Sequence, residues 1–186
     1  MTTWQEYLDK AAAYHGHICG GQILGIRMAQ LGLKLLSLKE GDDLCDLVIF
    51  LETDRCVADA AYVVTGLTLG RRRVKVRHFG KTAMSFLDLN SGKAYRIRVK
   101  MREHPALGTD IVAYWAQFSD DEIFDWYEVA IDLPPSELPG KPQSSVLCQN
   151  CGEEVLDRKE VVKDNRIFCR NCAEGSYYKR IDGAGE

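Results

Sequence analysis

The stretches CQNC at 148–151 and CRNC at 169–172 decide how this chain is divided. Each stretch places two thiols on one tight turn, and the seventeen residues between them let the chain fold back and bring the four sulfurs together. This spacing is typical of a tetrahedral structural zinc site. Disulfide bonds are the alternative, but they are typical of secreted proteins and nothing else in the sequence indicates secretion. The expected zinc ligands are Cys148, Cys151, Cys169 and Cys172.

A proline-rich segment precedes the cysteine pairs. Four of the five prolines lie in DLPPSELPGKPQSS at 132–145, which has the composition of a linker. We therefore expect a core domain over 1–133, a linker over 134–147 and a zinc-finger domain over 148–186. The last of these is too small to hold a hydrophobic core without its metal.

The bulk composition narrows the class of protein. The chain has 186 residues, of which 46% are hydrophobic, enough for one sizeable core. No apolar run is long enough to cross a bilayer, and MTTWQEYLDK at 1–10 lacks the order of a signal peptide, so we expect a cytoplasmic protein with reduced cysteines. The net charge of −3 gives no general attraction to nucleic acid. From residue 143 on, seven Lys and Arg face eight Asp and Glu, so nucleic-acid binding by the finger is not expected either.

Apolar spacing and capping residues predict an α+β core domain. A capping box of Thr3 and Glu6 begins the first helix, and Gly66 ends the third. The sheet is expected to be mixed or antiparallel, with helices packed against it. The predicted helices cover 4–14, 21–37, 56–65, 106–118 and a short segment capped by Ser119 and Glu122. The predicted strands cover 46–52, 72–78, 83–89, 94–101 and 127–133.

Two of these strands alternate basic and apolar residues. Such alternation places the apolar set on the core and the charges on the opposite face, which is usually solvated. Binding of an anionic ligand or an acidic partner is the alternative. The basic residues are Arg71, Arg73, Lys75 and Arg77 in one strand, and Arg96, Arg98, Lys100 and Arg102 in the other.

The segment HGHICGG at 15–21 is a candidate for chemistry. It places His15, His17 and Cys19 within five residues, beside glycines that allow a tight turn. A cysteine at a helix N-terminus favours the thiolate, and histidine and cysteine are both zinc ligands. The alternative is a turn with one capping histidine and a buried cysteine.

A second candidate segment is ETDRCVAD at 52–59, where a strand ends and a helix begins. Cys56 and Asp59 are three residues apart and share a helix face, although a capping Asp54 and a core cysteine are the alternative. We predict a shared pocket of His17, Cys19, Cys56 and Asp59. It would hold a second, labile metal or a metal-free thiol pair, and it requires the two cysteines to lie within about 10 Å of each other.

Three motifs carry a family resemblance: HGHICGGQILGIRMA at 15–29, ETDRCVADAAYVVTGLTLG at 52–70 and FGKTA at 79–83. In this order they resemble the formylmethanofuran dehydrogenase E-subunit family. The resemblance implies a thioredoxin-like core, a treble-clef-like zinc finger and a homodimer. It also implies anaerobic one-carbon metabolism beside molybdenum or tungsten enzymes.

Site residues carry over motif by motif. His17 and Cys19 match the family's His-x-Cys, and Cys56 and Asp59 match its Cys-x-x-Asp, which implies catalytic roles for these four. Lys81 matches the lysine of Gly-Lys-x-Ala and is implied in cofactor binding. The chain departs from many members at Gly20, where they have proline, and at Leu67, where they have a cysteine. If that cysteine is a ligand in those members, metal binding in this core is weakened.

Two functions follow from the sequence. The first is a metal-binding protein with a His/Cys active site in its core. The second is a non-enzymatic accessory protein that delivers metal to a larger oxidoreductase, or docks on it through the zinc finger. The sequence does not decide whether the chain is an enzyme.

Overall fold

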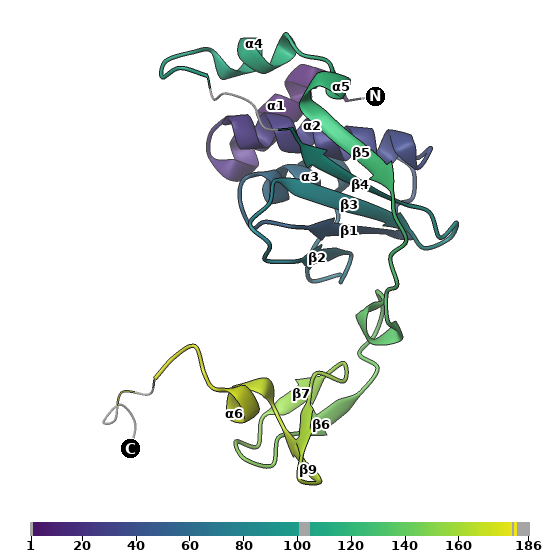
Figure 1. Ribbon diagram of the computed structural model, residues 1–186, viewed down its shortest axis with the longest axis vertical. Coiled ribbons are helices and arrows are strands. Elements are labelled where there is room, and N and C mark those ends of the chain that lie inside the picture. The colour runs from purple at the N-terminus through teal and green to yellow at the C-terminus, as the bar shows by residue number, and fades with distance from the viewer. Residues whose placement is uncertain (1, 101–104, 180, 182–186) are drawn as a thin grey trace. The chain divides into compact units, whose positions relative to one another are not determined.

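The computed structural model describes residues 2–100, 105–179 and 181 (Figure 1). The chain forms two compact units, Met1–Asp132 and Leu133–Glu186. None of the described helices is long and apolar enough to cross a membrane.

A five-stranded mixed sheet forms the centre of the first unit. Its order is β2-β1-β3-β4-β5, with β1 and β2 parallel and every other pair antiparallel. This confirms the predicted α+β class, while the thioredoxin-like description stays a prediction. The strands are β1 Leu47–Leu51, β2 Val74–Val76, β3 Ala83–Asp88, β4 Ala94–Val99 and β5 Phe124–Glu128.

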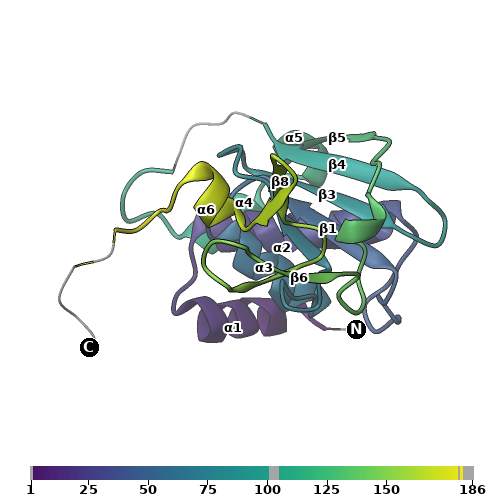
Figure 2. The same cartoon turned by 90° about the horizontal axis from the view of Figure 1, so that it is seen from below.

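Three helices form a layer on one face of this sheet (Figures 1 and 2). They begin and end where local chemistry predicts: Thr3 and Glu6 make the capping box of the first, and Gly66, at φ 67°, ends the third in the left-handed region. Two shorter helices follow β4. The helices are α1 Trp4–His15, α2 Gly20–Leu35, α3 Val57–Thr65, α4 Ile111–Ala116 and α5 Asp120–Ile123.

Helix α2 is the centre of the packing, and two of its glycines allow close contacts. A β-carbon at Gly25 would lie 2.5 Å from the β-carbon of Ala60 and 2.9 Å from the Cα of Val57, both in α3. A β-carbon at Gly32 would lie 2.5 Å from the Phe86 ring on β3. These positions let α2 approach α3 and the sheet more closely than any residue with a side chain would permit.

Three predicted elements are wrong in extent, one of them the strand predicted over 72–78, which is only β2. The helix predicted over 106–118 is only α4, because Gly108 has φ 86° and the Asp110 carboxylate accepts hydrogen bonds from the first free backbone N–H groups after it. The strand predicted over 127–133 is also wrong. The last strand of the sheet, β5, begins earlier than predicted, at the buried Phe124, directly after the single turn of α5.

The basic strand faces differ from the expected solvated surface. Lys75 is buried, with 7% of its surface exposed, and Arg96 makes a two-pronged ion pair with the buried Glu52. The predicted strand end at Met101 and the basic residue Arg102 lie outside the described residues.

The second unit is built from two hairpins and a short helix. Strand β6 pairs with β7 and β8 with β9, both antiparallel. The first of these strands begins at Ser145, within the segment predicted as linker. The elements are the 3-10 turn Pro135–Glu137, β6 Ser145–Leu147, β7 Glu154–Leu156, β8 Val161–Lys163, β9 Arg166–Phe168 and α6 Arg170–Glu174.

Candidate functional site

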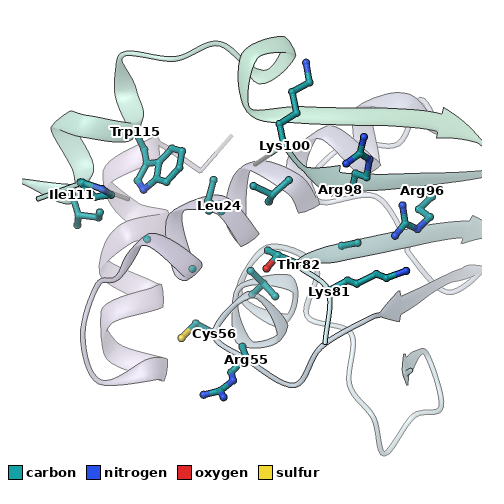
Figure 3. A pocket seen from close by; sticks show the side chains of 16 residues that line it. Leu24, Arg55, Cys56, Lys81, Thr82, Arg96, Arg98, Lys100, Ile111 and Trp115 are labelled. Carbon is teal, nitrogen blue, oxygen red and sulfur yellow. The ribbon is translucent and has the colours of Figure 1, made fainter. Parts of the chain in front are cut away.

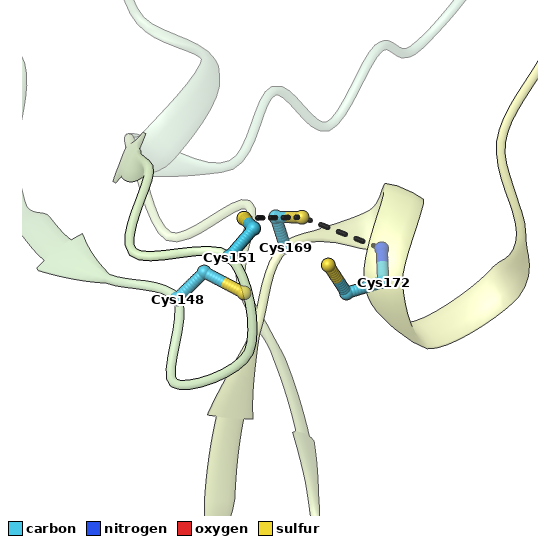
Figure 4. Close-up of side chains that lie close together, drawn as sticks. All are labelled: Cys148, Cys151, Cys169 and Cys172. Atoms are coloured by element: carbon cyan, nitrogen blue, oxygen red, sulfur yellow. Dashed lines mark hydrogen bonds between the residues drawn. The ribbon is translucent and has the colours of Figure 1, made fainter. Parts of the chain in front are cut away.

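The four cysteines of the second unit gather as the spacing predicts (Figure 4). Their sulfurs all lie within 4.8 Å of one another, and the Sγ atoms of Cys151 and Cys169 are 3.9 Å apart. Two thiolates on one tetrahedral zinc, with bonds of about 2.3 Å, would be separated by about 3.8 Å. The geometry of the cluster therefore fits a zinc ion.

The protonation of this cluster is uneven. Backbone N–H groups of Cys151 and Cys169 stabilise the Cys148 thiolate and lower its pKa to about 6. At Cys151, a backbone N–H of Glu153 favours the thiolate, but burial and the three neighbouring thiols outweigh it and raise the pKa to about 12. The pKa of Cys169 is raised as well, so the thiolates of Cys151 and Cys169 are disfavoured without a cation, and a divalent ion would stabilise them.

In the first unit, the segments of Cys19 and Cys56 meet at the start of two helices. Cys19 is the N-cap of α2 and Cys56 is the N-cap of α3. Gly21 permits the contact: a β-carbon there would lie 2.8 Å from the Cβ of Cys56, 3.6 Å from its Sγ and 3.7 Å from the Sγ of Cys19. Both sulfurs thus lie within 3.7 Å of one point, which satisfies the proximity required of a shared site.

His15 connects Asp59 to Cys19. Its Nδ1 lies 2.7 Å from an Asp59 carboxylate oxygen, and its Nε2 lies 4.0 Å from the Sγ of Cys19. If the carboxylate accepts a proton from Nδ1 of a neutral imidazole, Nε2 is the nitrogen left to bind a metal beside the sulfur. One zinc shared by these two atoms would hold them about 3.6 Å apart, close to the observed separation.

His17 completes a compact set of donors. Its ring centre is 4.9 Å from that of His15, and its side chain is exposed. One donor atom from each of His15, His17 and Cys19 lies within 4.8 Å of the other two. The set has the composition of a catalytic metal site with three protein ligands.

Cys56 lies beside this set. Burial raises the pKa of its thiol, and hydrogen bonding and charge repulsion with Cys19 raise it further. Its neutral thiol is therefore favoured when no cation is near.

A cavity of about 720 Å³ opens next to Cys56 (Figure 3). Lys81, the residue implied in cofactor binding, lies in the connection between β2 and β3 and lines this cavity. Arg55, two residues before α3, lines the cavity too. The other basic residues of the wall lie on β4 and just after it: Arg96, Arg98 and Lys100. The apolar part of the wall includes Leu24, Ile111 and Trp115.

The structure adds residues that the sequence did not select. The predicted site contained His17, Cys19, Cys56 and Asp59, but Asp59 contacts His15, which the sequence identifies only as a neighbouring imidazole. The spacing of His15 and Cys19, four residues apart across a glycine turn, was the available signal. The cationic wall formed by β4 was visible as an alternating pattern, but its position beside Cys56 depends on the fold.

Comparison with known proteins gives matches for both units. The family described as FmdE, molybdenum formylmethanofuran dehydrogenase operon, matches residues 14–137. The prokaryotic dksA/traR C4-type zinc finger matches residues 142–178. The second unit is thus a C4-type zinc finger with a cysteine cluster suited to zinc.

Two similar proteins span nearly the whole chain. A probable S-adenosyl-L-methionine-binding protein of Archaeoglobus fulgidus is 31% identical over 202 aligned positions, which cover 92% of this chain and 53% of that protein. The chain therefore spans about half the length of this curated relative. A tungsten formylmethanofuran dehydrogenase E-subunit (FmdE)-like protein from Syntrophus aciditrophicus has a similar crystal structure, with a TM-score of 0.62 and 24% identity over 94% of both chains. This likeness supports the fold. Because the FmdE model matches well over half of its residues, the chain belongs to the FmdE family.

Proposed function

We propose that the core unit binds one labile divalent metal ion through His15, His17 and Cys19, and presents an open coordination position to a small-molecule substrate. The observation that carries this proposal is the gathering of three donor atoms within 4.8 Å of one another, one of them on a histidine anchored by Asp59. A carboxylate on the far nitrogen of a metal-binding histidine fixes the tautomer and raises the basicity of the ligand.

The residues of the chain have separate roles in this proposal. His15, His17 and Cys19 hold the metal, Asp59 orients His15, and Cys56 offers a further thiol in the wall of the cavity. A metal ion with an open position would act as a Lewis acid on a substrate oxygen. Leu67, buried in the core, supplies no sulfur, which is consistent with a weakly held ion. The family's description names a molybdenum formylmethanofuran dehydrogenase operon, which supports a place beside that enzyme. A role in anaerobic one-carbon metabolism is part of the proposal.

Metal stoichiometry tests the proposal. The full chain should bind two equivalents of cobalt, and a competing chelator should remove the weaker one first. Cys19→Ser should lose the weaker equivalent and keep the other. Cys45→Ser is the matched control, because Cys45 is exposed and outside both clusters, and it should keep both.

Asp59→Asn tests the orientation of His15. It removes the carboxylate and keeps every proposed ligand, so the affinity of the weaker site should fall about 10–100-fold. Wild-type protein that binds a single equivalent, held by the cysteines of the finger, would refute the proposal.

A second candidate function is that of an accessory protein, which the C4-type finger favours. In that case the core would deliver its metal to a larger oxidoreductase that docks on the finger. Variants of the finger cysteines would then keep the core metal but lose transfer to the partner enzyme.

The name of the archaeal relative suggests S-adenosylmethionine as another ligand. This molecule carries two positive groups and one carboxylate, and among the described residues five basic side chains line the cavity beside Cys56. Charge repulsion therefore disfavours it in this cavity, and calorimetry with S-adenosylmethionine would show whether it binds.

A further inference from the structure

The cavity beside Cys56 has two chemically different ends (Figure 3). Leu24, Ile111 and Trp115 lie toward one end, and the basic side chains of Lys81, Arg96 and Arg98 lie toward the other. Of the residues that the structure describes, five cations and no carboxylate line the cavity. Its volume, about 720 Å³, falls within the range of small-molecule sites.

Nearby acids neutralise only part of this charge. Glu52 pairs with Arg96 at 2.6 Å, and Asp125 pairs with Arg98 at 2.6 Å and with Lys100 at 3.4 Å. Among the residues that the structure describes, no carboxylate forms an ion pair with the two remaining cations, Arg55 and Lys81. Among the described residues, these five cations outnumber the two carboxylates that pair with them, and such an excess of positive charge favours an anionic ligand.

The charged end is also held in place. The guanidinium of Arg96 donates two hydrogen bonds to Glu52 and one, of 2.8 Å, to the hydroxyl of Tyr127. Side-chain hydrogen bonding to Glu52 raises the pKa of Arg96 above its usual value, so the charge is permanent. A fixed cation that lines the same cavity as Lys81 stabilises an anion with little ordering cost at binding.

The opposite end is built for apolar contact. Trp115 is only 5% exposed, and its indole Nε1 has no hydrogen-bond partner among the described residues. Gly20 faces this nitrogen, since a β-carbon there would lie 3.2 Å from it. A simple inorganic anion would leave this end of the cavity without contacts.

We infer that the cavity binds an amphiphilic organic anion, with its carboxylate or phosphate at Lys81, Arg96 and Arg98 and its apolar body against Leu24, Ile111 and Trp115. The inference names the ligand class of the site proposed above. Any reaction of the bound anion depends on the metal site proposed above, but binding of the anion does not.

Calorimetry with phenyl phosphate and benzoate tests the inference on the full chain. Benzyl alcohol and benzylamine are the neutral and cationic comparisons, and inorganic phosphate lacks the apolar body. One or both aromatic anions should bind at least about tenfold more tightly than all three comparisons, the effect of one charge-assisted contact. The tighter of the two anions identifies the head group. Equal affinity for benzyl alcohol, or no binding of either anion, would overturn the inference.

Two lysine variants localise the contact. Lys81→Gln should weaken binding of the aromatic anion about tenfold. Lys93→Gln removes the same charge from the exposed loop between β3 and β4, and should change the affinity less than about twofold because a distant surface charge is screened. Ile111→Ala should weaken the aromatic anions and leave inorganic phosphate unchanged. Equal losses in the two lysine variants would mean that the anion responds to net charge alone, which contradicts the inference.

The same titrations in Cys19→Ser separate this inference from the proposed metal site. If the core metal is lost and the Lys81 effect persists, the cavity binds the anion through its own side chains, as inferred. If wild-type protein binds the anion but no core metal, only the proposed function fails. Loss of anion binding in Cys19→Ser would instead assign the anion to the metal and overturn the inference.

Discussion

Replacing Gly25 with alanine tests the close contact between α2 and α3. The new methyl group would lie 2.5 Å from the Cβ of Ala60 and 2.9 Å from the Cα of Val57. Both atoms are fixed to the backbone of α3, so neither can move away by a change of rotamer. The two helices must separate to accept the methyl group.

Two opposing effects set the size of the change. Alanine is favoured over glycine in a helix interior by about 1 kcal/mol. Overpacking of a dense core costs about 1–3 kcal/mol, and contacts this short with rigid atoms belong at the upper end. We therefore expect the free energy of unfolding of the core to fall by about 1–2 kcal/mol.

Urea unfolding followed by tryptophan fluorescence measures this free energy for the core alone. The chain has three tryptophans, Trp4, Trp115 and Trp126, and all three lie in the first unit. Gly70→Ala is the control, because a β-carbon there has no neighbour within 4 Å. Its free energy of unfolding should stay within about 0.5 kcal/mol of wild type or rise slightly.

A double variant identifies the contact responsible. Ala60→Gly removes the methyl group that Gly25→Ala would meet, so the combination should show a favourable coupling of about 1 kcal/mol. An increase in stability for Gly25→Ala by itself, equal to the helix preference, would refute the reasoning, since it would mean that the helices have room for a side chain.

Further predictions concern the finger, the assembly and the buried ion pair. Cys151→Ser should lose one zinc equivalent and unfold the second unit, with the tryptophan-monitored transition shifted by less than about 0.5 kcal/mol; a finger that stays folded without metal would contradict this. Light scattering should give a homodimer of the 20.9 kDa chain, and a monomer at micromolar concentration would count against it. Glu52→Gln should lower the stability of the core by about 2 kcal/mol, below the usual cost of breaking a buried pair because Arg96 keeps some solvent contact. Glu52→Leu with Arg96→Met should recover most of that loss, and equal stability of Glu52→Gln and wild type would contradict the assigned ion pair.

The sequence correctly predicted those helix ends that depend only on residues close by in the chain. The Thr3 and Glu6 capping box and the Gly66 helix end both act within a few residues, so they can be identified from the sequence. The four cysteines of the finger were predictable for the same reason, since each pair needs only a tight turn.

The remaining features depend on contacts between distant segments. Strand β5 begins at Phe124 because that residue pairs with Val99 of β4. Nothing in the sequence of 127–133 indicates this pairing. The contact of His15 with Asp59 joins residues 44 positions apart, so neither residue indicates the other by itself. Lys75 alternates like a surface residue, yet the tertiary structure buries it.

The glycine contacts of α2 also determine how rigidly the core site is held. Most sites are shaped by side chains that can rotate, so small shifts of the surrounding helices are absorbed as rotamer changes. At Gly21 and Gly25, α2 contributes no side chain to the interface, so its backbone packs directly against Cys56, Val57 and Ala60. Any sliding or tilting of one helix against the other must therefore change the distance between Cys19 and Cys56 by a similar amount. The site therefore deforms little, and the packing of α2 against α3 sets the distance between the thiols of Cys19 and Cys56.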